Sequence, residues 1–299
     1  MATFFVMRGN AAMTSQSTNP VSSLKLPHLR IVPVERVIPH EHHDPQRAEP
    51  LMRRIQASGV FRDPPLVMPL QDETGRFMIL DGTNRVTAIR RMGLPHILVQ
   101  VVPPDDPHVS LKTWNHLLWG LSSQALLAAI RPKVARPLKP VAFEEGYQAL
   151  HDREVLLLIS LPDGQAFALA PRPSSVAEAL AVLNRVVEAY LYRASLDRTV
   201  VARAVEVRHL HPDLAGIVVF PPFSIPQVLD AVAQGHRFPA GITRFTVAPR
   251  ALRLHYPLER LAAAGGLEDK NRELQQWLQE RLARKAVRYY AEPTVLFDE

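Results

Sequence analysis

Hydrophobic residues in the N-terminal third of the chain fall into short runs and into helically spaced sets. Four short apolar runs have the length of β-strands: 29–37, 66–68, 77–80 and 97–102. Between them, apolar residues three and four positions apart predict one short helix that stops at Gly59 and another that follows Arg85 and stops at Gly93. Strands and helices in this order predict a compact α/β module of about 80 residues.

Turn and cap signals organise the second half. Val155–Leu161 and Ala166–Ala170 flank the turn sequence Pro162–Gln165, so this segment is expected to form a β-hairpin. Ser174 or Ser175 can then cap a long helix, because a serine there precedes helically spaced apolar residues.

Three more elements are expected further along. Gly216–Phe220 has the composition of a strand, and Ser224 can cap a helix that ends at Gly235. Glu268–Tyr290 is a charged amphipathic helix. Its apolar stripe predicts a core or dimer contact rather than a catalytic role: Leu274, Trp277, Leu278 and Leu282.

The middle of the chain suggests a domain boundary. Leu111–Ile130 is apolar with helical spacing, and Arg131–Pro140 carries several prolines and cations, as a connector does. We expect a disordered tail over 1–26, a first domain over 27–118 and a second domain, which would contain this connector, over 119–299. Both domains are predicted to be α/β (α+β), with a cleft between them.

Composition narrows the functional classes. With 47% apolar residues in 299, the chain can bury a large core, and it has no apolar run long enough for a membrane span. Absent cysteines exclude disulfides and thiolate chemistry, and together with the lack of a recognisable secretion signal they favour a cytoplasmic protein. The net charge of +6 suits an anionic partner. Because the cations are scattered, a nucleotide is favoured over a nucleic acid.

The sequence Asp81-Gly82-Thr83-Asn84-Arg85 lies between an expected strand and an expected helix. Gly82 permits a tight bend, and free N–H groups at the helix start would lie beside the Arg85 cation. That combination suits a phosphate group. The alternative is an ordinary strand-to-helix turn with Asp81 or Thr83 as the N-cap.

A loop after the first strand contains Glu41 among His40, His42 and His43. Three histidines this close can suggest a metal site, although adjacent loop positions rarely converge on one ion. Glu41 is either a solvated surface charge or a general base that takes a proton from a hydroxyl.

Two further segments offer groups for an anion. Trp114 is either a core residue or the wall of a small pocket, with an indole N–H for a carboxylate. Pro239–Phe245 is either a plain loop or a site in which Gly241, Thr243 and Arg244 supply amides, a hydroxyl and a guanidinium. The sequence has no Walker A motif and no protein-kinase signature set.

Taken in order, these segments resemble the free L-serine kinases built on the ParB/sulfiredoxin fold, a group that includes an archaeal ADP-dependent enzyme and a staphylococcal siderophore-pathway enzyme. The likeness runs from about Leu29 to Leu261 and so covers both halves. The matching segments are Ile31–Val34 with Pro39–Glu41, Ile79–Gly82 with Arg85, Thr113–Trp114, Gly216–Phe220 and Phe238–Phe245.

The resemblance implies a ParB/sulfiredoxin-like N-terminal module and phosphorylation of free L-serine to O-phospho-L-serine, with ATP or ADP and Mg²⁺. It makes Glu41 the base and Asp81 a catalytic residue and magnesium ligand. It assigns the nucleotide phosphates to Gly82, Thr83, Asn84 and Arg85, and the amino acid to Trp114, Thr243 and Arg244. Asn84 departs from the family pattern, which usually has a histidine there. Asparagine can donate a hydrogen bond but cannot carry charge.

Two other functions stay open on the sequence alone. One is a ParB-like DNA-binding regulator, which should carry a helix-turn-helix after its nucleotide module. The other is a non-catalytic nucleotide or ligand sensor, which the Asn84 substitution permits. The sequence also leaves open the oligomeric state, the choice between ATP and ADP, and the pathway that uses the product.

Overall fold

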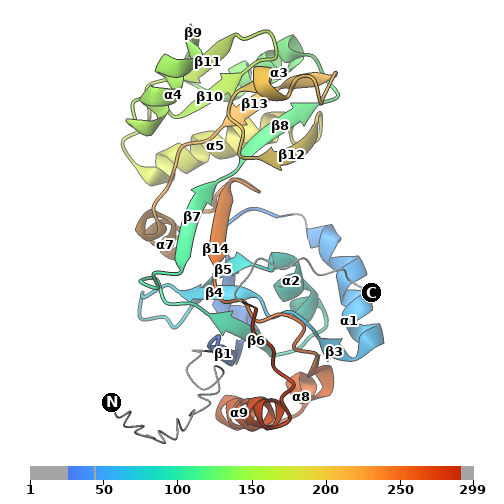
Figure 1. The fold of residues 1–299 in the computed structure, drawn as a ribbon. Coiled ribbons are helices and arrows are strands. Elements are labelled where there is room, and N and C mark those ends of the chain that lie inside the picture. The colour runs from blue at the N-terminus through green and yellow to red at the C-terminus, as the bar shows by residue number, and fades with distance from the viewer. Residues whose placement is uncertain (1–25, 44, 291–299) are drawn as a thin grey trace, which may run out of the picture. The chain divides into compact units, whose positions relative to one another are not determined.

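A computed structural model describes residues 26–43 and 45–290, and residues Pro27–Gln276 form one compact unit. The tail expected over 1–26 lies outside the described residues except for Leu26. The chain is a mixed α/β protein, as the sequence predicts (Figure 1). The boundary expected at 118/119 stays a prediction.

The first sheet has five strands in the order β1-β6-β4-β5-β2. Its strands are β1 (Leu29–Pro33), β2 (Val37–Pro39), β4 (Leu66–Pro69), β5 (Phe77–Asp81) and β6 (His96–Val101). The run 29–37 was expected to be one strand, but a 3₁₀ turn over Val34–Arg36 divides it into β1 and β2. Helices α1 (Glu49–Ser58) and α2 (Thr83–Arg91), which lie between these strands in the chain, pack against each other.

One strand pair in this sheet determines where the site forms. β2 runs parallel to β5, with Pro39 opposite Ile79. Parallel neighbours end at the same edge of a sheet, and ligands commonly bind outside the carboxyl ends of such strands. Glu41 and Asp81 therefore leave the sheet at the same edge.

The second sheet has six strands in the order β12-β8-β13-β10-β11-β9, and all of its neighbours are antiparallel. Its strands are β8 (Asn115–Trp119), β9 (Leu138–Val141), β10 (Leu157–Ser160), β11 (Ala166–Leu169), β12 (Ser195–Thr199) and β13 (Leu214–Val219). The hairpin expected around Pro162–Gln165 is confirmed as β10 and β11.

The helix expected over Leu111–Ile130 is wrong for its first half. Val109–Thr113 is strand β7 and Asn115–Trp119 is β8, so that only Ser123–Ile130 is helical, as α3. β8 lies between β12 and β13, and its residues are buried on both faces. A strand buried on both faces loses the alternation of polar and apolar residues, and its apolar run then resembles a buried helix. The expected connector over 131–140 also contains the start of β9.

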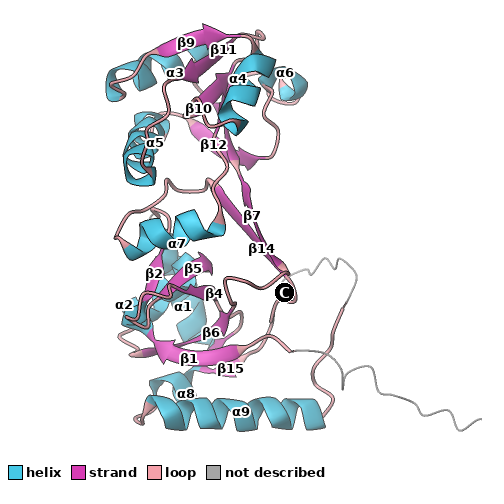
Figure 2. Cartoon of the chain, turned by 90° about the vertical axis from the view of Figure 1, so that its left-hand side faces the viewer, coloured by secondary structure: helices cyan, strands magenta, loops and turns pink. Residues whose placement is uncertain are grey.

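A two-stranded ribbon joins the parts that carry the two sheets. β7 pairs antiparallel with β14 (Thr243–Val247), and Thr113 lies opposite Thr243 (Figures 1 and 2). The chain then returns to the first part, where β15 (Tyr256–Pro257) pairs with β3 (Val60–Phe61). Thr243 and Arg244 of β14 therefore lie beside β7, the strand that precedes Trp114.

Two of the remaining helices confirm the cap signals, and the helix expected over Glu268–Tyr290 ends at Ala283. Ser175 accepts a hydrogen bond from the Glu178 N–H at the start of the long helix α5, and Ser224 forms a capping box with Gln227. These helices are α4 (Phe143–His151), α5 (Val176–Tyr190), α6 (Ala204–Val207), α7 (Ile225–Ala233), α8 (Leu258–Ala262) and α9 (Leu267–Ala283). Among the helices of the described residues, none is both long enough and apolar enough to cross a bilayer.

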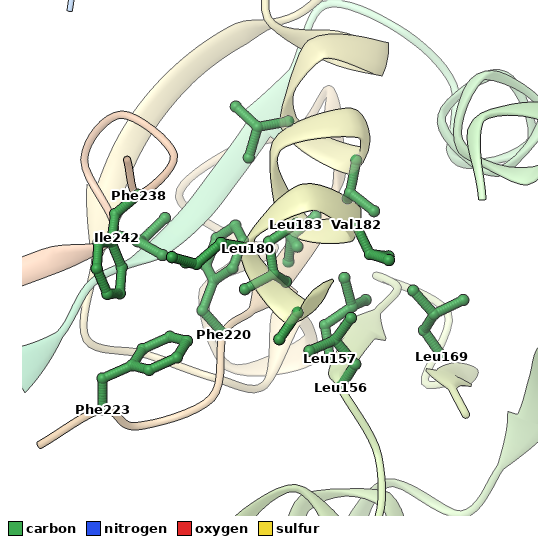
Figure 3. Packing of buried hydrophobic residues seen from close by; sticks show 14 of the residues in the cluster. Leu156, Leu157, Leu169, Leu180, Val182, Leu183, Phe220, Phe223, Phe238 and Ile242 are labelled. Atoms are coloured by element: carbon green, nitrogen blue, oxygen red, sulfur yellow. The ribbon is translucent and has the colours of Figure 1, made fainter. Parts of the chain in front are cut away.

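One hydrophobic cluster takes in residues of both sheets and of α3, α5 and α7. Leu180 and Leu183 of α5 pack beside Leu156 and Leu157 (Figure 3). The same cluster contains Phe238 and Ile242, which flank a turn considered below.

Candidate active site

Glu41 is held in a cradle of backbone and hydroxyl donors. Its Oε2 accepts a hydrogen bond from the Gly241 N–H at 2.7 Å. Its Oε1 accepts from the Thr243 N–H at 2.8 Å and lies 2.5 Å from the Thr243 hydroxyl oxygen. A carboxylate offers about four lone pairs, two on each oxygen. One acceptor position on Oε2 is thus left open, and the side chain is 18% exposed.

Two buried anchors fix this cradle. Phe238 and Ile242, on either side of the turn, are fully buried in the main hydrophobic cluster, and the Phe238 ring meets Phe223 edge to face (Figure 3). The loop of Glu41 is also bonded to the same segment, because Phe238 N–H donates to the His40 carbonyl and His42 N–H to the Phe238 carbonyl. The amides that face Glu41 are therefore fixed by packing.

Two of the three histidines beside Glu41 have separate hydrogen-bond partners. His40 is buried between the Ile79 carbonyl, 2.5 Å from Nδ1, and the Thr243 hydroxyl, 2.6 Å from Nε2. His43 Nε2 lies 3.1 Å from the Thr87 hydroxyl on α2, and His42 is exposed. Burial lowers the pKa of His40, and this outweighs the opposing effects of Glu41 and the Ile79 carbonyl. The contact with Thr87 places the Glu41 loop beside the first turns of α2.

The Asp81–Arg85 turn has the form expected for an anion site. Gly82, with φ of 97°, is the N-cap of α2, and no side chain caps the first N–H groups. The alternative of Asp81 or Thr83 as the N-cap is therefore wrong. The left-handed conformation at Gly82 and the uncapped start of α2 leave backbone donors directed out of the helix.

Asp81 is paired with two arginines. Its Oδ2 accepts from Arg85 at 3.1 Å and from Arg250 at 2.6 Å. Burial opposes ionisation of this carboxyl, but the two guanidinium groups outweigh that effect and hold its pKa below the usual range. Arg250 follows β14 and is a site residue that the sequence did not single out. Its only signal was a cation after Ala248-Pro249.

Arg85 retains donor capacity. Its Nε is buried and has no hydrogen-bond partner among the described residues. The guanidinium lies over Gly82, where an added Cβ would be 2.7 Å from Nη2 and 2.8 Å from Nε. A glycine is needed here both for its backbone angle and for the space that the arginine occupies. Asn84 lies in the first turn of α2.

Trp114 and Arg244 meet at the end of the ribbon. The backbone N–H of Trp114 donates to the Ile242 carbonyl at 2.9 Å, and the Arg244 guanidinium lies 4.4 Å from the centre of the indole ring. Arg198 is 6.0 Å from the same ring and was also not singled out by the sequence. Its side chain passes beside Gly241. This end of the ribbon thus combines an aromatic face with two cations.

Two open depressions among the described residues lie away from these side chains. One of about 620 Å³ is lined by Gln46, Glu49, Pro50, Arg53 and Arg91, at the end of α2 opposite Gly82. No cluster of three acidic or histidine side chains that could hold a metal ion occurs in the described ranges. The two arginines bind Oδ2 of Asp81, so its Oδ1 could still meet a metal carried by a nucleotide.

Comparison with known proteins points to one group. No family model matches the chain. It is 26% identical over 279 residues to the ATP-dependent L-serine kinase SbnI of Staphylococcus aureus, an alignment that covers 91% of this chain and 98% of that protein. The solved structure of C-terminally truncated SbnI from the same species has a TM-score of 0.66 at 24% identity, covering 85% of this chain and 97% of that one.

A second solved structure, a free serine kinase in complex with AMP, has a TM-score of 0.65 at 15% identity. It covers 79% of this chain and 95% of that one. The two structures establish a shared fold over most of the chain. The alignment to the staphylococcal L-serine kinase confirms the resemblance to free L-serine kinases that the motifs indicated.

Proposed function

We propose that this protein is a free L-serine kinase that transfers a phosphoryl group from ATP to the hydroxyl of L-serine and releases O-phospho-L-serine. The observation that carries the proposal is the position of Glu41. Its carboxylate has one open acceptor position on Oε2, at the sheet edge where the Asp81–Arg85 turn also lies. The full-length similarity to an ATP-dependent L-serine kinase supports ATP as the donor.

The nucleotide phosphates would bind at the start of α2. The uncapped N–H groups there, the positive end of the helix dipole and the free Nε of Arg85 are suited to phosphate oxygens. Gly82, Thr83 and Asn84 would contribute backbone donors. Arg250 would add a second cation once Asp81 turns to another partner.

The residues fit a magnesium ion that arrives with the nucleotide. Mg²⁺ commonly takes one or two protein carboxylates and completes its shell with phosphate oxygens and water. Asp81 would hold it through Oδ1. When bound, the ion would neutralise charge on the phosphate oxygens. The remaining work falls to the protein's own side chains.

The amino acid would lie at the end of the β7–β14 ribbon. Arg244 is suited to bind the serine carboxylate, and the Trp114 indole gives a flat wall beside it. Thr243 lies next to Glu41 and so marks where the serine hydroxyl must arrive. We place nucleotide binding in residues 27–118 and most of the amino-acid site in residues 119–299.

The chemistry follows from these positions. The serine Oγ–H donates to Glu41 Oε2, which takes the proton as Oγ attacks the terminal phosphorus. The bond between that phosphorus and the bridging oxygen breaks, and its electron pair leaves with the nucleoside diphosphate. Phosphoryl transfer depends mainly on positioning and charge neutralisation, so one base and one cationic turn are sufficient. A cytoplasmic location, where ATP is available, fits this reaction and the cysteine-free sequence.

A direct assay tests the proposal. Purified protein is incubated with L-serine, Mg²⁺ and either ATP or ADP, and ³¹P NMR follows the products. We expect a phosphoserine signal that grows with ATP and disappears when serine is omitted or EDTA is added. Nucleotide hydrolysis without phosphoserine would refute the proposal. Tight, steeply salt-dependent DNA binding without phosphoserine would instead favour the regulator hypothesis.

A further inference from the structure

His40 is held in one tautomer by its surroundings. Its Nδ1 lies 2.5 Å from the Ile79 carbonyl oxygen, which can only accept, so Nδ1 must carry a proton and donate. In a neutral imidazole the other nitrogen is then an acceptor. Burial lowers the pKa of His40 and so favours this neutral form. The acceptor Nε2 faces the Thr243 hydroxyl at 2.6 Å.

The Thr243 hydroxyl has two acceptors and one proton. On one side lies His40 Nε2 at 2.6 Å, and on the other lies Glu41 Oε1 at 2.5 Å. A hydroxyl can donate only once. When it donates to the Glu41 carboxylate, two lone pairs face each other across the short gap to His40. When Glu41 is protonated, its oxygen is a weaker acceptor and the hydroxyl can turn to His40.

We propose that His40 is a positioning residue that strengthens Glu41 as a base by competing with it for the single proton of the Thr243 hydroxyl. This inference rests on the proposed function. As serine gives its proton to Glu41 Oε2, the Thr243 O–H turns from Oε1 to His40 Nε2. The new hydrogen bond relieves the contact between His40 and Thr243, so protonation of Glu41 becomes more favourable. The proton from serine stays on Glu41, and His40 stays neutral throughout.

The other groups around His40, Thr243 and Glu41 come from several elements. β5 contributes the Ile79 carbonyl, and β14 contributes the edge-to-face Phe245 ring against His40. The nearby cations Arg244 and Arg198 lie over the Trp114 ring. Beneath the Gly241 turn is His116, and burial lowers its pKa to about 4. His42 follows Glu41 in the chain. Partial burial and then the Arg237 cation lower its pKa, whereas Glu188 raises it.

Two substitutions should shift the pH dependence of the kinase in opposite directions. His40→Asn keeps an amide that can donate to Ile79 but removes the acceptor at Nε2, so Thr243 donates to Glu41 without competition. Thr243→Val keeps the shape but removes a donor to the carboxylate. We expect the acid limb of kcat/KM for serine to move down by roughly one pH unit in His40→Asn and up by a similar amount in Thr243→Val.

Opposite shifts distinguish this role from a merely structural one. A structural role would lower activity without moving the acid limbs of the two variants in opposite directions. Thr243→Ser restores the hydroxyl and should return the limb towards its wild-type position. Nucleotide affinity, which the His40–Thr243–Glu41 unit does not touch, should stay within about twofold in each variant. An upward shift in His40→Asn would overturn the proposal, because it would mean that His40 is a cation stabilising the carboxylate. Unshifted limbs would overturn it as well.

A second measurement does not depend on activity. ¹⁵N NMR of histidine-labelled protein at neutral pH should show His40 neutral, with its proton on Nδ1. In Thr243→Val the Nε2 resonance should shift, because its hydrogen-bond partner is lost. An imidazolium, or a proton on Nε2, would contradict the inference. If wild-type protein makes no phosphoserine while these signals appear as expected, the kinase proposal fails and the shared hydroxyl stands.

Discussion

Glu41 and Asp81 follow neighbouring parallel strands at one edge of the first sheet, but they are held by different partners. Glu41 is held by two backbone amides and a hydroxyl, on a turn anchored by buried Phe238 and Ile242. Asp81 is half exposed and paired with Arg85 and Arg250. Neutral donors surround Glu41, whereas two cations keep Asp81 ionised. This difference fits the roles proposed for them, with Glu41 as the base and Asp81 at the phosphate site.

The largest expected effect comes from removing the base. Glu41→Gln keeps the size of the side chain and lacks a basic oxygen, so turnover should fall by about 10³-fold. Phosphoserine formation measures it, and Glu35→Gln, an exposed carboxylate in the same part of the chain, is the control. Turnover within a few-fold of wild type would remove Glu41 from the base role.

Arg85 tests the other half of the comparison. Arg85→Ala deletes the buried, unpartnered Nε and the guanidinium beside Gly82, and a lost charged hydrogen bond should weaken nucleotide binding about 10- to 100-fold. Isothermal titration calorimetry measures the affinity. Arg53→Ala, an exposed arginine on α1, is the matched control. Equal affinity in Arg85→Ala and wild type would exclude the phosphate site.

Substitution of Gly82 tests whether nucleotide binding depends on the position of the Arg85 guanidinium. In Gly82→Ala the new Cβ would meet the Arg85 guanidinium, so the arginine must move and nucleotide binding should weaken several-fold. Gly93→Ala is a matched control, because Gly93 also has a positive φ but nothing lies within 4 Å of an added Cβ. Both should lose about 1–2 kcal/mol of stability from backbone strain. A similar loss of affinity in both would show that strain alone is responsible.

The smallest expected effect concerns acid stability. The folded-state pKa of Asp81 is lowered, so its ionic contacts stabilise the fold above the unfolded-state pKa near 3.8, and this stabilisation is lost as pH falls through the folded value. Because the side chain is 49% exposed, solvent screening limits the contribution to about 1 kcal/mol or less. Urea unfolding of wild type and Asp81→Asn should differ near neutral pH and converge in acid. A difference that grows in acid would contradict the assignment.

The sequence predicted local elements better than it predicted their pairing. The β5–α2 turn, the β10–β11 hairpin and the caps at Ser175 and Ser224 are all encoded by a few adjacent residues. The strand β8 was missed because its burial depends on β12 and β13, which come about 80 or more residues later. Local patterns cannot report such long-range pairing.

The same limit applies to the site. Glu41 and the Asp81–Arg85 turn could be singled out from residue type and spacing. The hydrogen bonds from Gly241 and Thr243 to Glu41, and the pairing of Arg250 with Asp81, join residues far apart in the chain. His40 was considered only as a metal ligand, because nothing in the sequence shows that Thr243 lies beside it.

The most direct test of the division between the two carboxylates is the affinity of Glu41→Gln for ATP. Calorimetric titration of this variant with Mg²⁺–ATP should give a dissociation constant within about twofold of wild type, although the variant forms almost no phosphoserine. Loss of nucleotide binding together with turnover would contradict the account, because a single site would then be performing both tasks.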